Sequence, residues 1–126
     1  MALLNKKQIM ESKDIVTETV AVPEWGGDVL IRTLTGTQRD AFEASLMGKG
    51  KKADMVNIRA RLVARSVVDE QGARVFCDGE IEALGMKSAK ALDRIFDAAQ
   101  KLNGIREEDI EELEKNSEAA QDDSSI

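Results

Sequence analysis

Hydrophobic residues follow two different spacings along this chain, and the first of them is typical of β-strands. In residues 14–22, Val16, Val20 and Val22 recur at period two on one side, with Glu18 interrupting them. β-branched residues at this spacing favour a half-buried strand. A Pro-Glu-Trp-Gly-Gly run then ends the strand, and residues 28–34 (DVLIRTL) form a second apolar run. We therefore expect a β-hairpin over about residues 14–34, and a short extended segment over residues 74–77.

Helical spacing dominates after the hairpin. Thr35 and Gln38 fit a capping box, which predicts a helix over about residues 35–47 with Phe42 and Leu46 in its buried stripe. The next apolar stripe, over about residues 54–68, is wide, so we expect this helix, capped by Asp54, to be central to the core.

The most regular helical pattern covers residues 88–103, where apolar positions recur at i, i+3, i+4 and i+7. Ser88 is a natural N-cap, and Gly104 stands where a left-handed C-cap belongs. Shorter helices are expected over residues 3–12, 79–84 and 107–115. These elements indicate a helix-rich α+β fold, a single domain with one N-terminal β-hairpin.

Negative charge is concentrated at the C-terminal end of the chain. Residues 105–126 contain nine acidic side chains against Arg106 and Lys115, whereas the first 104 residues are nearly neutral. Like-charge blocks with few apolar residues do not bury enough surface to order themselves. We therefore expect a folded domain over residues 1–104, followed by an acidic helix and a disordered acidic tail over residues 105–126.

The composition argues against catalysis and against metal or cofactor binding. The chain has no histidine and no tyrosine, and Cys77 is its only cysteine. Histidine is the commonest general base and imidazole ligand, and one thiol is too few for a cysteine metal site. We predict a protein that is not an enzyme, with no catalytic residues, no metal site and no cofactor.

Three other features suggest chemistry only weakly. Glu80 and Glu82 are two residues apart and would not face each other on a helix, so we interpret them as surface acids. The glycines and lysines of residues 48–52 lack the spacing and the following Ser or Thr of a phosphate-binding loop. The same basic loop could face nucleic acid together with nearby arginines, but the acidic net charge and the few aromatic residues oppose that hypothesis.

No apolar run approaches the length that spans a bilayer, and the first 14 residues lack the pattern of a signal peptide. We therefore expect a protein that stays in the cytoplasm where it is made, without membrane contact.

A series of short motifs along the chain resembles the tail assembly chaperone family of long-tailed bacteriophages. The hairpin region contains K-D-x-x-T-E, V-P-E-W-G-G and V-x-x-R-x-L-T-G, and R-D-A-F-E-A-S follows in the next predicted helix. Further matches are IRARLVA, SVVD, ALDRIF, LNG and ELEKN, in that order along residues 58–116. The resemblance covers nearly the whole chain and rests on the order of the motifs rather than on any single one.

The resemblance implies a chaperone that binds the tape measure protein, keeps it soluble and helps recruit tail tube subunits. It further implies that the protein acts in the host cytoplasm, is absent from the mature virion, and is the short form of a pair made by programmed frameshifting, the longer form contacting the tube protein. Homo-oligomers are possible partners. The alternatives are a small structural tail completion protein and a nucleic-acid-binding regulator.

Contacts with a partner protein are expected from a small set of side chains. Trp25 is the only tryptophan, and it either folds back onto the hairpin or anchors a partner, because tryptophan is enriched at binding hot spots. Methionine gives adaptable contact surface, and arginines mark the wetter side of the 54–68 helix. The predicted partner-binding residues are Trp25, Met47, Arg59, Arg61, Arg65 and Met86.

Overall fold

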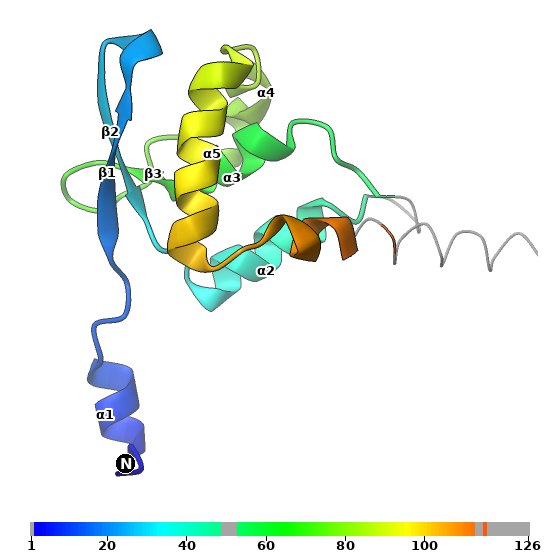
Figure 1. Cartoon of the computed structure of the whole chain (residues 1–126). Coiled ribbons are helices and arrows are strands. Elements are labelled where there is room, and N and C mark those ends of the chain that lie inside the picture. The colour runs from blue at the N-terminus through cyan, green and yellow to red at the C-terminus, as the bar shows by residue number, and fades with distance from the viewer. Residues whose placement is uncertain (1, 49–52, 113–114, 116–126) are drawn as a thin grey trace, which may run out of the picture.

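The computed structural model describes residues 2–48, 53–112 and 115, and it shows a helix-rich α+β domain with a three-stranded antiparallel sheet (Figure 1). The elements follow in the order α1 (Lys6–Glu11), β1 (Thr17–Val22), a 3₁₀ turn η1 (Pro23–Trp25), β2 (Gly27–Arg32), α2 (Gly36–Ser45), α3 (Ile58–Ser66), β3 (Val67–Val68), a second 3₁₀ turn η2 (Asp78–Glu80), α4 (Ile81–Leu84) and α5 (Ala89–Asn103). A further helical segment covers residues 107–112. The predicted α+β class is confirmed.

Strands β1 and β2 form the predicted hairpin. In their register Val20 lies opposite Val29, and Val22 lies opposite Gly27. Residues directly opposite each other share a face of the sheet. Val20, Val22 and Ile31 are buried and mark the inner face, whereas Val16, which precedes β1, is exposed.

The hydrophobic core lies between the inner face of the sheet and the helices. Helix α5 packs on β1, β2 and α3, and α3 also contacts α2 and α4. In Figure 1, α5 stands beside the hairpin, with α3 behind it and α2 below. The largest fully buried apolar side chains are Phe42, Ile31, Leu46, Leu62, Ile95, Val22 and Val63. The predicted buried stripes of the 35–47 and 88–103 helices are therefore confirmed at their central positions.

The helix predicted over residues 54–68 starts later than expected. Helix α3 begins at Ile58, because Asn57 adopts the left-handed conformation with φ of 59°. The carboxylate of Asp54 accepts a hydrogen bond from the backbone N–H of Val56 at 3.2 Å. This two-residue bond forms a local turn instead of capping a helix.

The same prediction is also wrong at the C-terminal end, because Val67 and Val68 form strand β3. They pair with Ile31 and Leu30 of β2, so the sheet has a third strand beyond the hairpin. Two consecutive β-branched residues favour an extended backbone. Val67 and Val68 therefore form a strand because they can pair with the edge of β2. Helical periodicity in the sequence cannot reveal that this edge is available.

The predicted helix caps are present in the structure. Thr35 accepts a hydrogen bond from the backbone N–H of Gln38 at 3.1 Å, and the Gln38 side chain accepts one from the N–H of Thr35 at 2.9 Å. Ser88 caps α5, and Gly104 ends it with φ of 66°. The boundaries of both helices follow from local sequence.

The core continues past the end of α5. Ile105 is buried, and Ile110 of the 107–112 segment packs against the core. The basic loop at residues 49–52, Leu113, and the predicted disordered tail at 116–126 lie outside the described residues. The proposed boundary at residue 104 stays a prediction.

Candidate partner-binding surfaces

The six predicted partner-binding residues are spread over several elements and do not form one site. Trp25 ends η1, Met47 follows α2, and Met86 lies between α4 and α5; all three are exposed. Arg59 is exposed in the first turn of α3 and forms an ion pair with Asp93 of α5. Partner binding by these residues stays a prediction, and their positions show which of them a partner can reach.

Arg61 is held by contacts within the chain. It donates to the backbone oxygens of Ser45 and Asp54 at 2.7 and 2.8 Å, and to the Asp54 carboxylate at 2.9 Å. The bond from Arg61 lowers the pKa of Asp54 below its ordinary value. Arg61 therefore fastens the connection after α2 to α3, which leaves its guanidinium little free hydrogen-bonding capacity.

Arg65 is buried in the same helix. It donates to the Arg61 carbonyl at 3.1 Å, and its other terminal nitrogen lies 4.0 Å from an Asp78 oxygen. Burial lowers the pKa of Arg65, and the nearby Asp78 partly offsets that effect. A buried and partnered guanidinium stabilises the fold around it, and a partner protein cannot reach it without moving the residues that cover it.

Trp25 lies at a groove on the outer face of the sheet. Two adjoining depressions of about 740 and 520 Å³ share Trp25 and Phe76. The floor includes Leu30 of β2 and its neighbour Val68 of β3. We call this surface the Trp25 groove, and its lining consists of Thr19, Trp25, Asp28, Val29, Leu30, Val67, Val68, Asp69, Glu70, Gln71, Val75, Phe76, Glu80, Ala83, Leu84 and Lys87.

The hairpin turn fixes the upper wall of this groove. Pro23 starts η1, and Gly26 closes it in the left-handed conformation with φ of 74°, which favours glycine. Glu24 accepts a hydrogen bond from Arg94 of α5 at 2.7 Å. That bond lowers the pKa of Glu24 and raises the pKa of Arg94. The turn is thus tied to α5 on one side and presents Trp25 on the other.

The opposite wall is built by the segment after β3. Arg74 forms a β-bridge with Val68, and its side chain donates to the Ala64 carbonyl at 3.1 Å and to Asp78 at 3.0 Å. The Arg74 bond lowers the pKa of Asp78. These contacts hold the following Val75 and Phe76 at the groove. Phe76 is partly buried against the core, and Val75 is exposed.

A second exposed apolar surface lies on the N-terminal arm, by which we mean residues 2–13. Helix α1 has a complete capping box between Asn5 and Gln8, yet none of its residues is buried. Leu3, Leu4, Ile9 and Met10 are 97%, 64%, 55% and 75% exposed. Figure 1 shows the arm standing off from the rest of the domain, at the end of β1 that is far from the hairpin turn.

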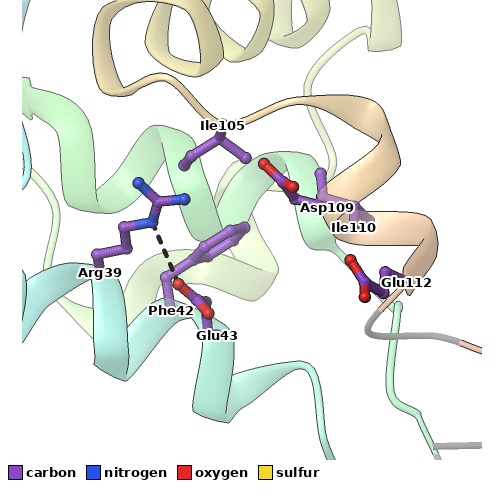
Figure 2. Close-up of a pocket in the computed structure, with 7 residues that line it drawn as sticks. All are labelled: Arg39, Phe42, Glu43, Ile105, Asp109, Ile110 and Glu112. Atoms are coloured by element: carbon purple, nitrogen blue, oxygen red, sulfur yellow. Dashed lines mark hydrogen bonds and ion pairs between the residues drawn. The ribbon is translucent and has the colours of Figure 1, made fainter. Parts of the chain in front are cut away.

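A smaller pocket lies between α2 and the 107–112 segment (Figure 2). Its volume is about 270 Å³, and it is lined by Arg39, Phe42, Glu43, Ile105, Asp109, Ile110 and Glu112. Arg39 forms an ion pair with Glu43 at 3.2 Å, and the backbone N–H of Arg106 lowers the pKa of Asp109. A carboxyl held ionised is no proton donor near neutral pH, so Asp109 is not suited to act as a general acid.

Metal and membrane sites find no support in the part of the chain that the structure describes. Within residues 2–48, 53–112 and 115, no three His, Cys, Asp or Glu side chains are placed to hold a metal ion. No helix among these residues is long and apolar enough to cross a bilayer. Cys77 is exposed and forms no disulfide with another described residue.

Sequence reasoning identified Trp25 but not the surface around it. Phe76, Leu30 and Val68 come from three segments that only the folded sheet brings together. The arm did carry a signal, because Leu4 and Ile9 stand on either side of the Asn5 cap at the spacing of a hydrophobic staple.

Comparison with known proteins gives two findings. A family model described as "Phage tail assembly chaperone" matches residues 5–116. The tail assembly chaperone of bacteriophage HK97 has a similar fold, with a TM-score of 0.56 and 22% sequence identity over 76% of this chain and 90% of that one. Among proteins with curated descriptions, none is similar enough in sequence to count as a match.

Proposed function

Since this chain belongs to the phage tail assembly chaperone family, a family of assembly factors and not of enzymes, we propose that it binds the tape measure protein of its phage. In this proposal the chaperone keeps that client soluble until tail tube subunits enclose it, and a longer, frameshifted form recruits those subunits. It acts in the host cytoplasm and is absent from the mature virion.

The observation that carries the proposal is the Trp25 groove. A tape measure protein is long and helical, and its apolar stripe needs cover before the tube closes. Amphipathic helices are commonly bound in grooves of this kind, where aromatic and aliphatic side chains receive the apolar stripe. Trp25, Phe76, Leu30 and Val75 supply such side chains on one face. Exposed apolar surface gathered in one depression is typical of a protein interface.

The position of Met86 supports the same surface. It is 84% exposed and directly precedes Lys87, which lines the groove. An exposed methionine that close in sequence to the groove could add adaptable contact area. Of the six predicted residues only Trp25 lines the groove, and Met47, Arg59, Arg61, Arg65 and Met86 are not among its lining residues.

Co-expression with the tape measure protein tests the proposal. The wild-type chaperone is expected to raise the soluble fraction of the client and to co-purify with it. Val75→Asp, at a position 49% exposed in the groove, is expected to lower the co-purified client about tenfold, since a charge in an apolar contact costs at least about 1.4 kcal/mol.

The matched control is Val56→Asp. Val56 is 68% exposed and lies outside the groove lining, so the same substitution there is expected to leave client binding unchanged. Equal losses from the two variants would show that the groove is not the client surface. Failure of the wild-type protein to solubilise or bind the client would contradict the proposed function itself.

The completion-protein alternative differs in one measurable respect. A structural component must be present in purified virions, whereas the proposed chaperone must be missing from them. Mass spectrometry of purified particles separates the two.

A further inference from the structure

The N-terminal arm has the form of a binding element whose partner is missing from a single copy of the chain. Isolated helices as short as α1 are marginal in water, yet α1 is fully capped and none of its residues is buried. Leu4 and Ile9 occupy the N′ and N4 positions of a hydrophobic staple, which lie side by side on one face of the helix start. Leu3 and Met10 are exposed as well, so the arm carries four large apolar side chains that no described residue covers.

Charge distinguishes what this face can bind. The arm carries Lys6, Lys7 and Lys13 against Glu11, a net charge of +2. Within the described residues, none of these lysines forms an ion pair. The arm is therefore an apolar and basic element, and it fits an apolar surface with an acidic rim.

The Trp25 groove has that character. Its floor is apolar, and its charged lining residues are Asp28, Asp69, Glu70 and Glu80 against Lys87, a net charge of −3. Asp28, Asp69 and Glu70 form no ion pair with any described residue. Opposite charge around an apolar contact favours association and fixes its orientation.

The direction of the chain favours a groove on a different copy. Val16 is held beside Thr33 by hydrogen bonds, including one from the Thr33 N–H to the Val16 carbonyl at 2.9 Å. Residues 12–15 then lead away from the sheet (Figure 1), and this Ser-Lys-Asp-Ile stretch has neither the glycine nor the proline that a tight reversal favours. The arm thus points away from the end of the hairpin where Trp25 lies.

We infer that the N-terminal arm of one copy docks into the Trp25 groove of a second copy. The apolar face of Leu4 and Ile9 lies on Trp25 and Phe76, and the arm lysines face the acidic rim. The two surfaces are different, so each copy in such a contact keeps either a free arm or a free groove. This contact does not depend on the proposed client, although the two share the groove and would compete for it.

Two full-length variants test the contact. Leu4→Asp/Ile9→Asp disables the arm, and Asp28→Lys/Glu70→Lys reverses charge on the groove rim without touching the core. The wild-type protein is expected to self-associate with rising concentration in analytical ultracentrifugation. Each variant is expected to weaken this association at least about tenfold. Unchanged far-UV circular dichroism and melting temperature show that both variants fold.

Mixing the two variants gives the decisive result. The arm variant retains an intact groove, and the groove variant retains an intact arm. An equimolar mixture is therefore expected to form heterodimers, although each variant by itself associates only weakly. A second arm variant, Lys6→Glu/Lys7→Glu, carries acidic residues that match the reversed charge of the groove variant. It should therefore bind the groove variant more tightly than it binds the wild-type protein. Lys101→Glu, on the exposed side of α5, is the charge control and should change nothing.

Three outcomes would overturn the inference. They are a wild-type protein that stays monomeric at about 1 mM, variants that associate as the wild type does, and a mixture that forms no heterodimer. If the wild-type protein is monomeric and its Trp25 fluorescence differs from that of the arm variant, the arm lies in the groove of its own copy instead. No tape measure protein is present in these measurements, so their failure and the failure of client binding are separate results.

Discussion

Asn103 joins two parts of the fold that are far apart in the sequence, and removing its side chain should destabilise the whole domain. Its carbonyl oxygen accepts a hydrogen bond from the backbone N–H of Leu34 at 2.7 Å, and its amide nitrogen donates to the carbonyl of Ala99 at 2.8 Å. Leu34 is buried where β2 ends and α2 is about to begin. The side chain thus fastens the C-terminus of α5 to the end of the sheet.

The loss of stability in Asn103→Ala can be estimated from the two hydrogen bonds that the substitution removes. A buried N–H left without an acceptor costs about 1–3 kcal/mol, and the lost bond to Ala99 costs about 0.5–1.5 kcal/mol. Alanine regains about 0.5 kcal/mol through its higher helix propensity. We therefore expect Asn103→Ala to lower the free energy of unfolding by about 2 kcal/mol.

Asn5→Ala is the matched control. Asn5 also accepts a backbone hydrogen bond through its side chain, from Gln8 at 2.9 Å, but it caps a helix in which no residue is buried. Loss of that cap should unfold α1 locally and change the global free energy of unfolding by less than about 0.5 kcal/mol.

Urea unfolding followed by far-UV circular dichroism measures both variants. With a denaturant slope of about 2 kcal/mol per molar, Asn103→Ala should lower the unfolding midpoint by about 1 M. The measurement is made at low protein concentration, where self-association does not contribute. Equal shifts for the two variants, or no shift for Asn103→Ala, would refute the view that this side chain fastens α5 to the sheet.

Two further predictions concern backbone strain and pH. Neither Gly104 nor Gly36 has an atom within 4 Å of an added Cβ, so the two positions differ in backbone conformation and not in space. Gly104 has φ of 66°, so Gly104→Ala should lower the free energy of unfolding by about 1 kcal/mol. Gly36→Ala is the control and should be close to neutral in the same urea assay. Arg74 lowers the pKa of Asp78 below its ordinary value of 3.8, so the stabilisation is present above about pH 4 and is lost as pH falls through the lowered pKa. Asp78→Asn should therefore lower the melting temperature near neutral pH, with a difference from the wild type that shrinks toward zero in acid; a constant difference would contradict this assignment.

Local signals in the sequence were sufficient for the elements whose causes are local. The capping box of Thr35 and Gln38, the Ser88 cap and the Gly104 end of α5 all depend on residues within a few positions of one another. The hairpin was predictable for the same reason, because Pro23 and Gly26 lie between two apolar runs.

The predictions failed where distant residues decide the structure. Val67 and Val68 fit a helical stripe equally well, and only the free edge of β2 draws them into the sheet. The pattern of α3 also could not reveal that Arg61 binds the backbone oxygens of Ser45 and Asp54, whereas partner binding by the arginines of this helix stays a prediction. The Trp25 groove is assembled from three segments, so no single stretch of sequence contains its shape.

The surfaces proposed for binding and the residues that stabilise the fold are largely different. Trp25, Val75 and the arm lie outside the fully buried core, whereas the core is formed by side chains such as Ile31, Phe42 and Ile95. Large losses of stability come mainly from buried groups, while substitutions at exposed positions change stability little. It follows that client binding and self-association can each be altered at the surface while the domain stays folded. If charge reversal on the groove rim unfolded the domain, stability and binding would depend on the same residues, and the groove would have to be interpreted as part of the structural core.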